Sequence, residues 1–479
     1  MYIGSKGYSV PKASITSNVE VLIKKDLTIK PFSINNTKNR FLNKIETFPA
    51  YREENGEIYV PMYYGISKFG IPTDIRISDG VNICVPFNGS LRDYQAPVIA
   101  KTLDYFRNTP NPISSGLLEL PCAWGKTGGA LYMVSQISKK TLVIVHKTFL
   151  MNQWIERIAQ FLPTAKVGRI QGSVFDVDGK DIVLCMLQSL SMKEYNTDIF
   201  SEFGFTIIDE VHHISSQTFS CALFKVITKY MIGLTATLQR KDGTTPVIKM
   251  FIGDVIYKGV REERLNVLVK AHHYYTDDAV FNDTVMDWKG NPMYSTMITK
   301  LCNYSQRTEF ILDIIQQMYT DNPIQQIMVL AHNKSILTYI YDAISSRSIC
   351  DGSVGYYIGG MKEEALKESE GKKIIIATYS MAAEALDIKT LTTLVMATPK
   401  TDIEQAVGRI LRDRHSSPLI VDIVDQHGIF MNQWKKRKTF YKSNRYEITE
   451  IRNREEPKHA ETEREFSGFG KCMISFAKK

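Results

Sequence analysis

A glycine, a lysine and a threonine follow a short apolar run in a pattern that suits phosphate binding. The run spans residues 116–120, and Gly125, Lys126 and Thr127 come after a turn. We expect a helix from Lys126, because N–H groups at a helix N-terminus bind phosphate oxygens and a glycine permits close approach. Lys126 would neutralise the β- and γ-phosphates of a nucleotide, and Thr127 would hold Mg²⁺. Leu120 replaces the first glycine of the usual pattern, so this segment alone fits an ordinary strand–turn–helix junction equally well.

Two adjacent carboxylates close a second apolar run. The run spans residues 205–208, and Asp209, Glu210 and, two positions later, His212 follow it. Carboxylates at the carboxyl end of a parallel strand lie at the ligand crevice of an open α/β sheet. There Asp209 would hold Mg²⁺, while Glu210 would orient and deprotonate an attacking water. In isolation such a pair more often caps the next helix, but its occurrence together with Lys126 favours a nucleotide triphosphatase.

A third segment, further along the chain, offers paired guanidinium groups. Gln405, Gly408, Arg409 and Arg412 have the spacing i, i+3, i+4 and i+7, which puts them on one face of a helix. Arginines in this arrangement suit the spread charge of a phosphoryl-transfer transition state. Paired arginines alone are usually a solvated face, but the glycine beside them indicates close approach to another surface.

Two successive sets of apolar runs predict the architecture. The first set comprises residues 117–120, 142–146, 182–186, 206–209 and 231–235. The second set comprises residues 327–331, 354–358, 373–378, 393–397 and 419–424. Helical stretches separate the runs, so each set should form a mostly parallel sheet covered by helices. The phosphate loop and the acidic pair fall in the first set and the arginines in the second, so a nucleotide would lie between two lobes whose closure accompanies hydrolysis.

In this order, the motifs resemble those of superfamily 2 helicases and translocases. The XPB branch is the most similar in three places: Asp-Glu-Val-His at 209–212, Leu-Pro-Cys at 120–122, and Leu-Thr-Ala-Thr at 234–237, followed by a charged triplet at 240–242. In size and layout the chain resembles a viral sub-branch, the poxvirus transcript-release helicase and its relatives in other large DNA viruses. The resemblance covers residues 91–425.

The resemblance implies an α/β fold of two tandem RecA-like lobes with a small N-terminal accessory domain and a basic C-terminal helical extension. The expected boundaries are 1–90 for the accessory domain, 91–262 for the ATP-binding lobe, 263–430 for the second lobe and 431–479 for the extension with its loose tail. Residues 257–306 should contain the linker between the lobes and a short insertion.

The same resemblance implies roles for individual residues. The expected catalytic residues are Lys126, Glu210, Gln405, Arg409 and Arg412, of which the two arginines act as fingers. The expected nucleotide contacts are Arg92, Gln95, Gly125, Lys126, Thr127 and Asp387. The expected metal ligands are Thr127 and Asp209, and the expected coupling residues are His212, Thr235 and Thr237. The expected nucleic-acid contacts are Lys147, Thr148, Arg169, Gly172, Gln188, Ser189, Asn333, Lys334 and Thr378, on loops that grip phosphates without reading bases.

The implied function is an ATP- and Mg²⁺-dependent DNA helicase or translocase, acting in transcript release or termination or in repair, with a viral origin. Its partners would be nucleic acid, with DNA favoured, and the transcription machinery. An RNA helicase stays open, since no base-reading or 2′-OH-reading motif is visible. A catalytically weak scaffold of a transcription complex and a restriction-type translocase subunit also stay open, although the intact Lys126, Asp209 and Glu210 argue against the scaffold.

Composition agrees with this interpretation without requiring it. Among 479 residues, 59 are basic and 51 acidic, and the net charge of +8 is compatible with phosphate-backbone binding and with much else. No run approaches the ~18 apolar residues of a membrane span, and no secretory segment is visible at the N-terminus. The seven cysteines lack C-x-x-C spacing, which predicts reduced thiols. We therefore expect no membrane partner and an intracellular location, cytoplasmic or nuclear, or a viral factory or virion.

A basic stretch at 432–442 interleaves lysines with Trp434, Phe440 and Tyr441. Such a helix could lie against DNA phosphates, with its lysines as the contacts. Alternatively, the aromatic side chains could dock the helix on the second lobe and leave the lysines in solvent. The sequence leaves both possibilities open.

Overall fold

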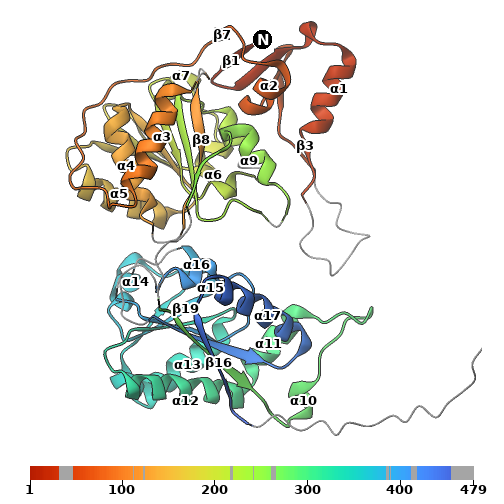
Figure 1. Cartoon of the computed structure of the whole chain (residues 1–479), viewed down its shortest axis with the longest axis vertical. Helices are drawn as coiled ribbons and strands as arrows, with labels where there is room; N and C mark the ends of the chain where they lie inside the picture. The colour runs from red at the N-terminus through yellow and green to blue at the C-terminus, as the bar shows by residue number, and fades with distance from the viewer. Residues whose placement is uncertain are drawn as a thin grey trace, which may run out of the picture.

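Two large parallel sheets and a smaller N-terminal sheet organise the described part of the chain (Figure 1). The computed structural model describes residues 1–31, 47–109, 111, 113–121, 124–215, 220–240, 242–259, 266–384, 388, 390–410 and 418–454. Figure 1 shows the large sheets one below the other along the longest axis, with the N-terminal elements beside the first. Within the described residues, no helix combines the length and the apolar content that a membrane span needs.

The first lobe is built on a sheet with the strand order β11-β10-β12-β9-β13-β14-β8-β15. All its pairings are parallel except that of β10 with β11. The neighbours β13 (Phe205–Ile208), β14 (Tyr230–Thr235) and β8 (Ser114–Glu119) are continuous apolar runs because helices cover both faces of the sheet. The remaining elements are α3 (Ala96–Asn108), α4 (Lys126–Ile137), β9 (Thr141–Val145), α5 (Thr148–Phe161), β10 (Val167–Gln171), β11 (Val174–Asp176), β12 (Ile182–Met186), α6 (Leu187–Met192), α7 (Thr197–Phe200), η2 (Val211–Ser215), η3 (Cys221–Phe224), α9 (Thr245–Ile252) and β15 (Val255–Lys258).

The second lobe is built on an all-parallel sheet with the order β18-β19-β17-β20-β21-β16-β22. Its strands are β16 (Leu268–Tyr274), β17 (Ile327–Ala331), β18 (Val354–Tyr357), β19 (Ile374–Thr378), β20 (Thr393–Met396), β21 (Leu419–Asp425) and β22 (Glu447–Arg452). Its helices are α10 (Ala279–Asn282), α11 (Tyr294–Asn303), α12 (Ser305–Asp321), α13 (Lys334–Ser346), η4 (Ile349–Gly352), α14 (Glu363–Glu370), α15 (Tyr379–Glu384), α16 (Glu404–Val407) and α17 (Gly428–Ser443).

Two strands of the second lobe lie where the sequence predicted none. β16 falls inside the segment interpreted as linker and insertion, and β22 falls inside the segment interpreted as a helical extension. β16 pairs with β21 on one side and with β22 on the other. Lys270, His272 and His273 interrupt the apolar pattern of β16, and its partners come much later in the chain, so local periodicity does not reveal it. The domain boundaries given above remain predictions.

The N-terminal residues form a separate small sheet that packs on the first lobe. The Tyr63 hydroxyl donates to the Ser115 carbonyl at 3.1 Å, and Arg52 Nη2 donates to the Cys221 carbonyl at 3.1 Å. The aromatic side chains Tyr8 and Tyr64 are buried there, as core residues should be. The elements are β1 (Tyr2–Gly4), β2 (Gly7–Pro11), η1 (Lys12–Ser14), α1 (Ser17–Asp26), β3 (Thr28–Ile29), β4 (Phe48–Pro49), β5 (Arg52–Glu54), β6 (Glu57–Val60), α2 (Met62–Phe69) and β7 (Asp74–Ile75).

The basic helix α17 docks on the second sheet through its aromatic side. Trp434 and Tyr441 are buried in the core of the lobe. Arg437 makes a bidentate ion pair with Asp422, in which Nε donates to Oδ2 at 2.7 Å and Nη2 donates to Oδ1 at 2.9 Å. Lys435 and Lys436 are exposed. The structure therefore shows the predicted docking through the aromatic side chains, and contact of the exposed lysines with DNA stays a prediction.

A second buried ion pair, Arg307 with Asp425, joins α12 to β21, with contacts of 2.5 and 2.7 Å and no exposed side-chain surface. We predict that Asp425→Ala lowers the free energy of unfolding of the second lobe by about 3–5 kcal/mol, because it leaves a guanidinium buried without its partner. Urea denaturation would measure this. The matched control is Glu309→Ala, which breaks the half-exposed pair with Arg347 and should cost about 0–1 kcal/mol. Equal costs for the two variants would contradict the prediction.

Candidate active site

Residues 124–127, at the start of α4, have features that suit an anion, and we call them the phosphate cradle. α4 begins at Lys126, as predicted, and among the described residues no side chain caps its N-terminus. Gly125 adopts φ of 87°, in the left-handed region, and a Cβ there would lie 2.5 Å from Gln95 Nε2. Lys126 Nζ donates to the Leu120 carbonyl at 3.3 Å, which holds the ammonium group over the loop. Free N–H groups, a close-approach glycine and a cation together suit a phosphate.

Gln95 supports this loop from behind. Its Oε1 accepts from the Arg92 backbone N–H at 3.0 Å, and its Nε2 donates to the Trp124 carbonyl at 2.8 Å. The Trp124 indole is buried in the core of the first lobe, where a Cβ on Gly129 would lie 3.1 Å from the ring. The large Trp124 side chain thus points into the core of the lobe and away from Lys126.

The acidic pair follows β13, on the edge of the sheet that carries the phosphate loop. Trp154 Nε1 donates to Asp209 Oδ2 at 2.9 Å, and burial together with the neighbouring Glu210 charge raises the pKa of Asp209 to about 6. Glu210 has φ of 47°, unusual for a side-chain-bearing residue, and its buried Oε2 has no hydrogen-bond partner among the described residues. Desolvated acids beside a phosphate cradle suit a cation and a water molecule.

The residue His212 links this pair to β14. Its Nδ1 lies 3.4 Å from Glu210 Oε2 and 3.2 Å from Thr235 Oγ1. The Thr235 hydroxyl donates to the Thr237 carbonyl at 2.8 Å. Burial, followed by the nearby Arg240 and Lys126 charges, lowers the pKa of His212 to about 4, so the ring is neutral near pH 7. The three residues expected to couple hydrolysis to movement are therefore in one chain of contacts.

Residues of the second lobe face this chain of contacts across a cavity of about 320 Å³. The cavity is lined by His212, Thr237, Gln239, Arg240, Asp242, Lys400, Asp402, Glu404, Gln405 and Ala406. Gln405 thus lies opposite the coupling residues, on α16. Arg409 Nε donates to the Ala382 carbonyl at 2.8 Å, so in this arrangement that guanidinium contacts its own lobe. Arg412 and Asp387 lie outside the described residues.

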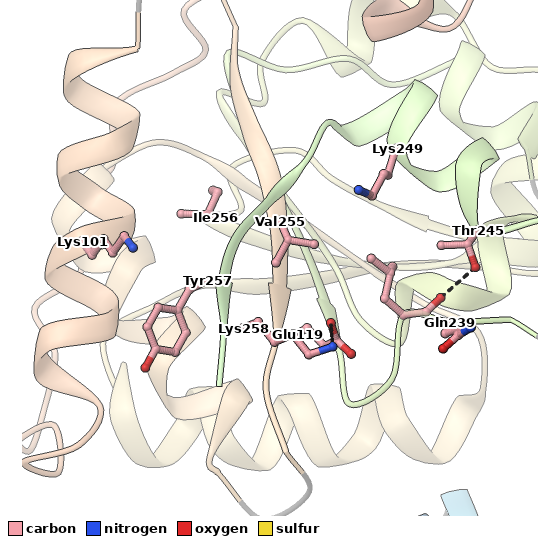
Figure 2. Close-up of a pocket in the computed structure, with 10 residues that line it drawn as sticks. Lys101, Glu119, Gln239, Thr245, Lys249, Val255, Ile256, Tyr257 and Lys258 are labelled. Atoms are coloured by element: carbon pink, nitrogen blue, oxygen red, sulfur yellow. Dashed lines mark hydrogen bonds and ion pairs between the residues drawn. The ribbon is translucent and has the colours of Figure 1, made fainter. Parts of the chain in front are cut away.

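A larger cavity of about 670 Å³ opens beside β15 on the first lobe and is not the candidate site (Figure 2). Neither His212, Thr237 nor any residue of the second lobe lines it, whereas all of these contribute to the smaller cavity. Its charged side chains also have partners: Lys258 pairs with Glu119 at 3.1 Å, and Lys101 lies 5.6 Å from the centre of the Tyr257 ring. Volume alone is therefore a poor guide to the chemistry of this protein.

Three of the predicted nucleic-acid segments converge on the first lobe. Gln171 Nε2 donates to Thr148 Oγ1 at 2.9 Å, and the Gly172 N–H donates to Ser189 Oγ at 3.0 Å. The expectation that these residues lie on loops was partly wrong. Arg169 is an exposed residue of β10, and Gln188 and Ser189 belong to the first turn of α6. β10 lies between β11 and β12, one strand in from the sheet edge, and its sequence Val-Gly-Arg-Ile-Gln has too few apolar residues to predict a strand.

On the second lobe the predicted contacts lie at two neighbouring strand ends. Asn333 and Lys334 follow β17 and start α13, and Thr378 is the last residue of β19. Ala331 and Thr378 are opposite each other in the parallel ladder. The structure thus brings these residues together, and their contact with nucleic acid stays a prediction.

Known proteins share this arrangement of segments. Residues 88–240 match the family described as "Type III restriction enzyme, res subunit". A protein of Acanthamoeba polyphaga mimivirus, named as an ATP-dependent RNA helicase, is 36% identical over 452 residues, which span 92% of this chain and 85% of the relative. The chain belongs to the superfamily 2 helicases. For this helicase, family membership implies ATP use, usually with Mg²⁺, and binding of nucleic acid.

Further similarities agree with the family and the fold. A protein of African swine fever virus (strain Badajoz 1971 Vero-adapted), also named as an ATP-dependent RNA helicase, is 25% identical to this helicase over 398 residues, spanning 76% of the chain and 75% of the relative. The structure of S. cerevisiae Dbp5 bound to RNA and ADP BeF3 aligns with a TM-score of 0.51 at 12% identity, covering 74% of this chain and 89% of Dbp5. The predicted fold of two RecA-like α/β lobes is confirmed.

The sequence did not reveal a stack of three histidines beside the acidic pair. The His146 and His213 ring centres are 3.9 Å apart, and those of His213 and His212 are 4.3 Å apart. Both ring nitrogens of His146 are buried without a hydrogen-bond partner among the described residues. The stack joins the segment that starts α5, where Lys147 and Thr148 lie, to the acidic pair. Sequence alone could not predict these ring contacts, because a single histidine after a strand does not indicate which distant side chain it will meet.

We predict that His146→Phe reduces the loss of stability in acid. Burial, followed by the His213 charge, lowers the pKa of His146 from 6.5 to about 3, so the folded protein keeps the ring neutral while the unfolded chain takes up a proton below about pH 6.5. Stability is therefore lost as the pH falls from 6.5 toward 3. Between about pH 7 and pH 5.5 the wild type should lose roughly 1 kcal/mol more unfolding free energy in urea than the variant. An equal loss in both proteins would contradict this.

Proposed function

We propose that this helicase is an ATP-dependent DNA helicase or translocase that couples Mg-ATP hydrolysis to movement along DNA. The observation that carries the proposal is the convergence of groups from both lobes. Lys126 and the acidic pair follow β8 and β13 of the first lobe, which are separated by the single strand β14, and Gln405 lines the cavity from the second lobe. A reaction assembled from two lobes proceeds only when they close, which ties chemistry to motion.

The residues at the cradle fit a nucleotide with its metal. Bound Mg-ATP would supply the phosphoryl group and the metal charge. Lys126 and the open N-terminus of α4 would hold the phosphates, and Thr127 with Asp209 would hold the metal. Glu210 would orient a water and take its proton, a task supported by its buried Oε2, which makes no hydrogen bond among the described residues.

Other roles in the proposal rest on the family resemblance. Arg92 and Gln95 would contact the nucleotide, as would Asp387. Arg409 and Arg412 would act as fingers once the lobes close, which requires Arg409 to leave the Ala382 carbonyl.

DNA is the proposed track, held by its phosphates at the converging segments of the two lobes. The resemblance to the XPB branch supports DNA and a role in transcription or repair with a partner from the transcription machinery. RNA is the second candidate, because relatives from mimivirus and African swine fever virus are named as RNA helicases. Both tracks have the phosphate backbone that these segments suit.

The test is ATP hydrolysis without polymer, with single-stranded DNA, with duplex DNA and with RNA. We predict that DNA stimulates turnover and that Glu210→Gln lowers kcat by about 10²- to 10⁴-fold while ATP still binds, because only proton transfer is lost. Glu194→Gln makes the same chemical change at a side chain that is 89% exposed and should match the wild type. If RNA stimulates turnover more strongly than DNA, RNA is the polymer along which the helicase moves. Turnover that Glu210→Gln leaves intact, or no turnover at all, would overturn the proposal.

A second prediction concerns the phosphate contacts. Arg169→Gln should weaken binding of every polymer sequence alike and lower the slope of log K against log salt by about 1, because one phosphate contact is lost. Fluorescence anisotropy over a salt series would measure the slope. Arg107→Gln removes the same charge from an exposed position on α3, away from the converging segments, and should leave the slope unchanged. The prediction is wrong if both variants behave alike.

A further inference from the structure

The cavity of about 670 Å³ beside β15 opens along the outer side of an edge strand (Figure 2). β15 is the last strand of its sheet, and within the described residues β8 is its only strand neighbour. The Leu117 N–H donates to the Asp254 carbonyl at 2.9 Å, and the Gly259 N–H donates to the Glu119 carbonyl at 2.8 Å. Because successive strand residues direct their backbone groups to opposite sides, part of β15 between these bonds faces away from β8. Such an edge is a template for an extended polypeptide segment.

Lysines stand on both sides of this edge. α3 covers one face of the sheet and supplies Lys101, and α9 covers the other face and supplies Lys249 (Figure 2). Lys258, at the end of β15, is the third lysine of the lining, and Glu119 is the one acidic residue in it. The lining therefore has an excess of positive charge, which favours an acidic occupant.

The present partners of these lysines can be replaced. Lys258 pairs with Glu119 at 3.1 Å, and Lys249 pairs with Asp254 at 3.0 Å, but both lysines are exposed. Lys101 is also exposed and has the face of the Tyr257 ring beside it. Ion pairs as exposed as these contribute little to stability, so an incoming carboxylate can take the place of the present partner.

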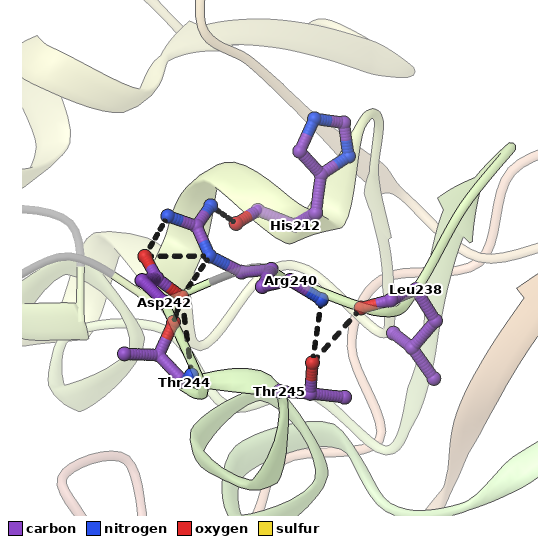
Figure 3. A network of polar contacts seen from close by, with 6 residues as sticks. All are labelled: His212, Leu238, Arg240, Asp242, Thr244 and Thr245. Carbon is purple, nitrogen blue, oxygen red and sulfur yellow. Dashed lines mark hydrogen bonds and ion pairs between the residues drawn. The ribbon is translucent and has the colours of Figure 1, made fainter. Parts of the chain in front are cut away.

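One wall of the cavity is held in shape by hydrogen bonds (Figure 3). Leu238 and Thr245 line this wall, and the Thr245 hydroxyl donates to the Leu238 carbonyl at 3.2 Å. The Arg240 N–H donates to Thr245 Oγ1 at 2.9 Å. The Arg240 side chain in turn donates to the His212 carbonyl at 2.5 Å and to Asp242 Oδ1 at 3.0 Å. A wall that is already ordered lowers the entropy cost of binding a partner.

The floor of the cavity is apolar. Val255, Ile256 and Tyr257 line it and are each partly exposed. The register of β15 on β8 shifts between Val255 and Tyr257. An incoming segment would therefore pair with the backbone over a short stretch only, and its side chains would supply most of the affinity.

This cavity lies at the far end of the sheet from the segments predicted to hold nucleic acid. Arg169 is on β10, and residues 148 and 189 contact the end of the same strand and the turn after it. In the strand order, β15 is six strands away from β10, which at ~4.8 Å per strand is about 29 Å along the sheet. A protein segment therefore suits the cavity better than the polymer along which the helicase moves.

We propose that this cavity docks an extended, acidic segment of a partner protein, which lies along β15 between Lys101 and Lys249. Carboxylates on its two sides would meet these lysines, and apolar side chains between them would cover Tyr257 and its neighbours. Docking at this edge leaves the converging segments around β10 uncovered. The inference goes beyond the proposed function and does not depend on whether DNA or RNA is the polymer.

The experiment uses two fluorescent peptides, one of alternating glutamate and valine and one of alternating lysine and valine, with the full-length protein. Anisotropy should show that the wild type binds only the acidic peptide. We expect Lys101→Glu combined with Lys249→Glu to weaken this binding about tenfold and to bind the basic peptide, which also shows that the variant is folded. Lys435→Glu combined with Lys436→Glu makes the same charge change on α17 and should behave like the wild type. No binding of the acidic peptide by the wild type, or an equal loss in both double variants, would overturn the inference.

Hydrogen–deuterium exchange locates the bound peptide. The acidic peptide should protect amides of residues 255–258, and not those of β11 at the opposite edge of the sheet. Nucleic acid and a second copy of this chain are the other candidate occupants. Lys101→Glu combined with Lys249→Glu should leave the affinity for single-stranded DNA and the oligomeric state as in the wild type. A fall in DNA affinity as large as that for the peptide, a loss of self-association, or protection at β11 instead of β15 would overturn the inference.

Discussion

The register of three parallel strands is the constraint on which the rest of the site depends. β13 pairs with β14 and β14 with β8, with Ile208 opposite Gly233 and Thr235 opposite Glu119. Gly233 has no room for a side chain, because a Cβ there would lie 2.7 Å from Leu117. The side chain of Leu117 therefore occupies the space beside Gly233, and the three strands end at the same edge. The predicted phosphate loop, the acidic pair and Thr235 lie at that edge, and their spacing follows from the hydrogen-bond ladder and not from the loops themselves.

The same edge concentrates groups that are costly for the folded protein. Asp209 is partly desolvated beside another acid, Glu210 Oε2 is buried without a hydrogen bond among the described residues, and burial lowers the pKa of three histidines. None of these features stabilises the fold, whereas the buried carboxylates Asp425 and Asp422 of the second lobe each have an arginine partner. Polar groups left unsatisfied in the first lobe are what a binding site requires, because an incoming ligand supplies the missing partners.

Sequence alone predicted the elements whose signal is local. The buried strands have nearly the predicted bounds, α4 begins at Lys126, and Asp209 directly follows β13. These features were predictable because each apolar run and its flanking polar residues are contiguous in the chain. Contacts between distant segments escaped prediction. His146 on His213, and Arg240 on the His212 carbonyl, depend on which strands become neighbours, and that information is not contained in either segment. β16 and β10 were missed because polar residues interrupt their pattern.

The position of β16 in its sheet has a consequence for how the chain folds as it is made. Strands of the first lobe end at β15, so that sheet has all its members before the second lobe is synthesised. β16 comes next, but it pairs only with β21 and β22, from residue 419 onward. During synthesis β16 therefore stays unpaired until most of the second lobe has emerged from the ribosome. Unpaired strands invite aggregation, and Lys270 with its neighbouring histidines keeps this one polar during the delay.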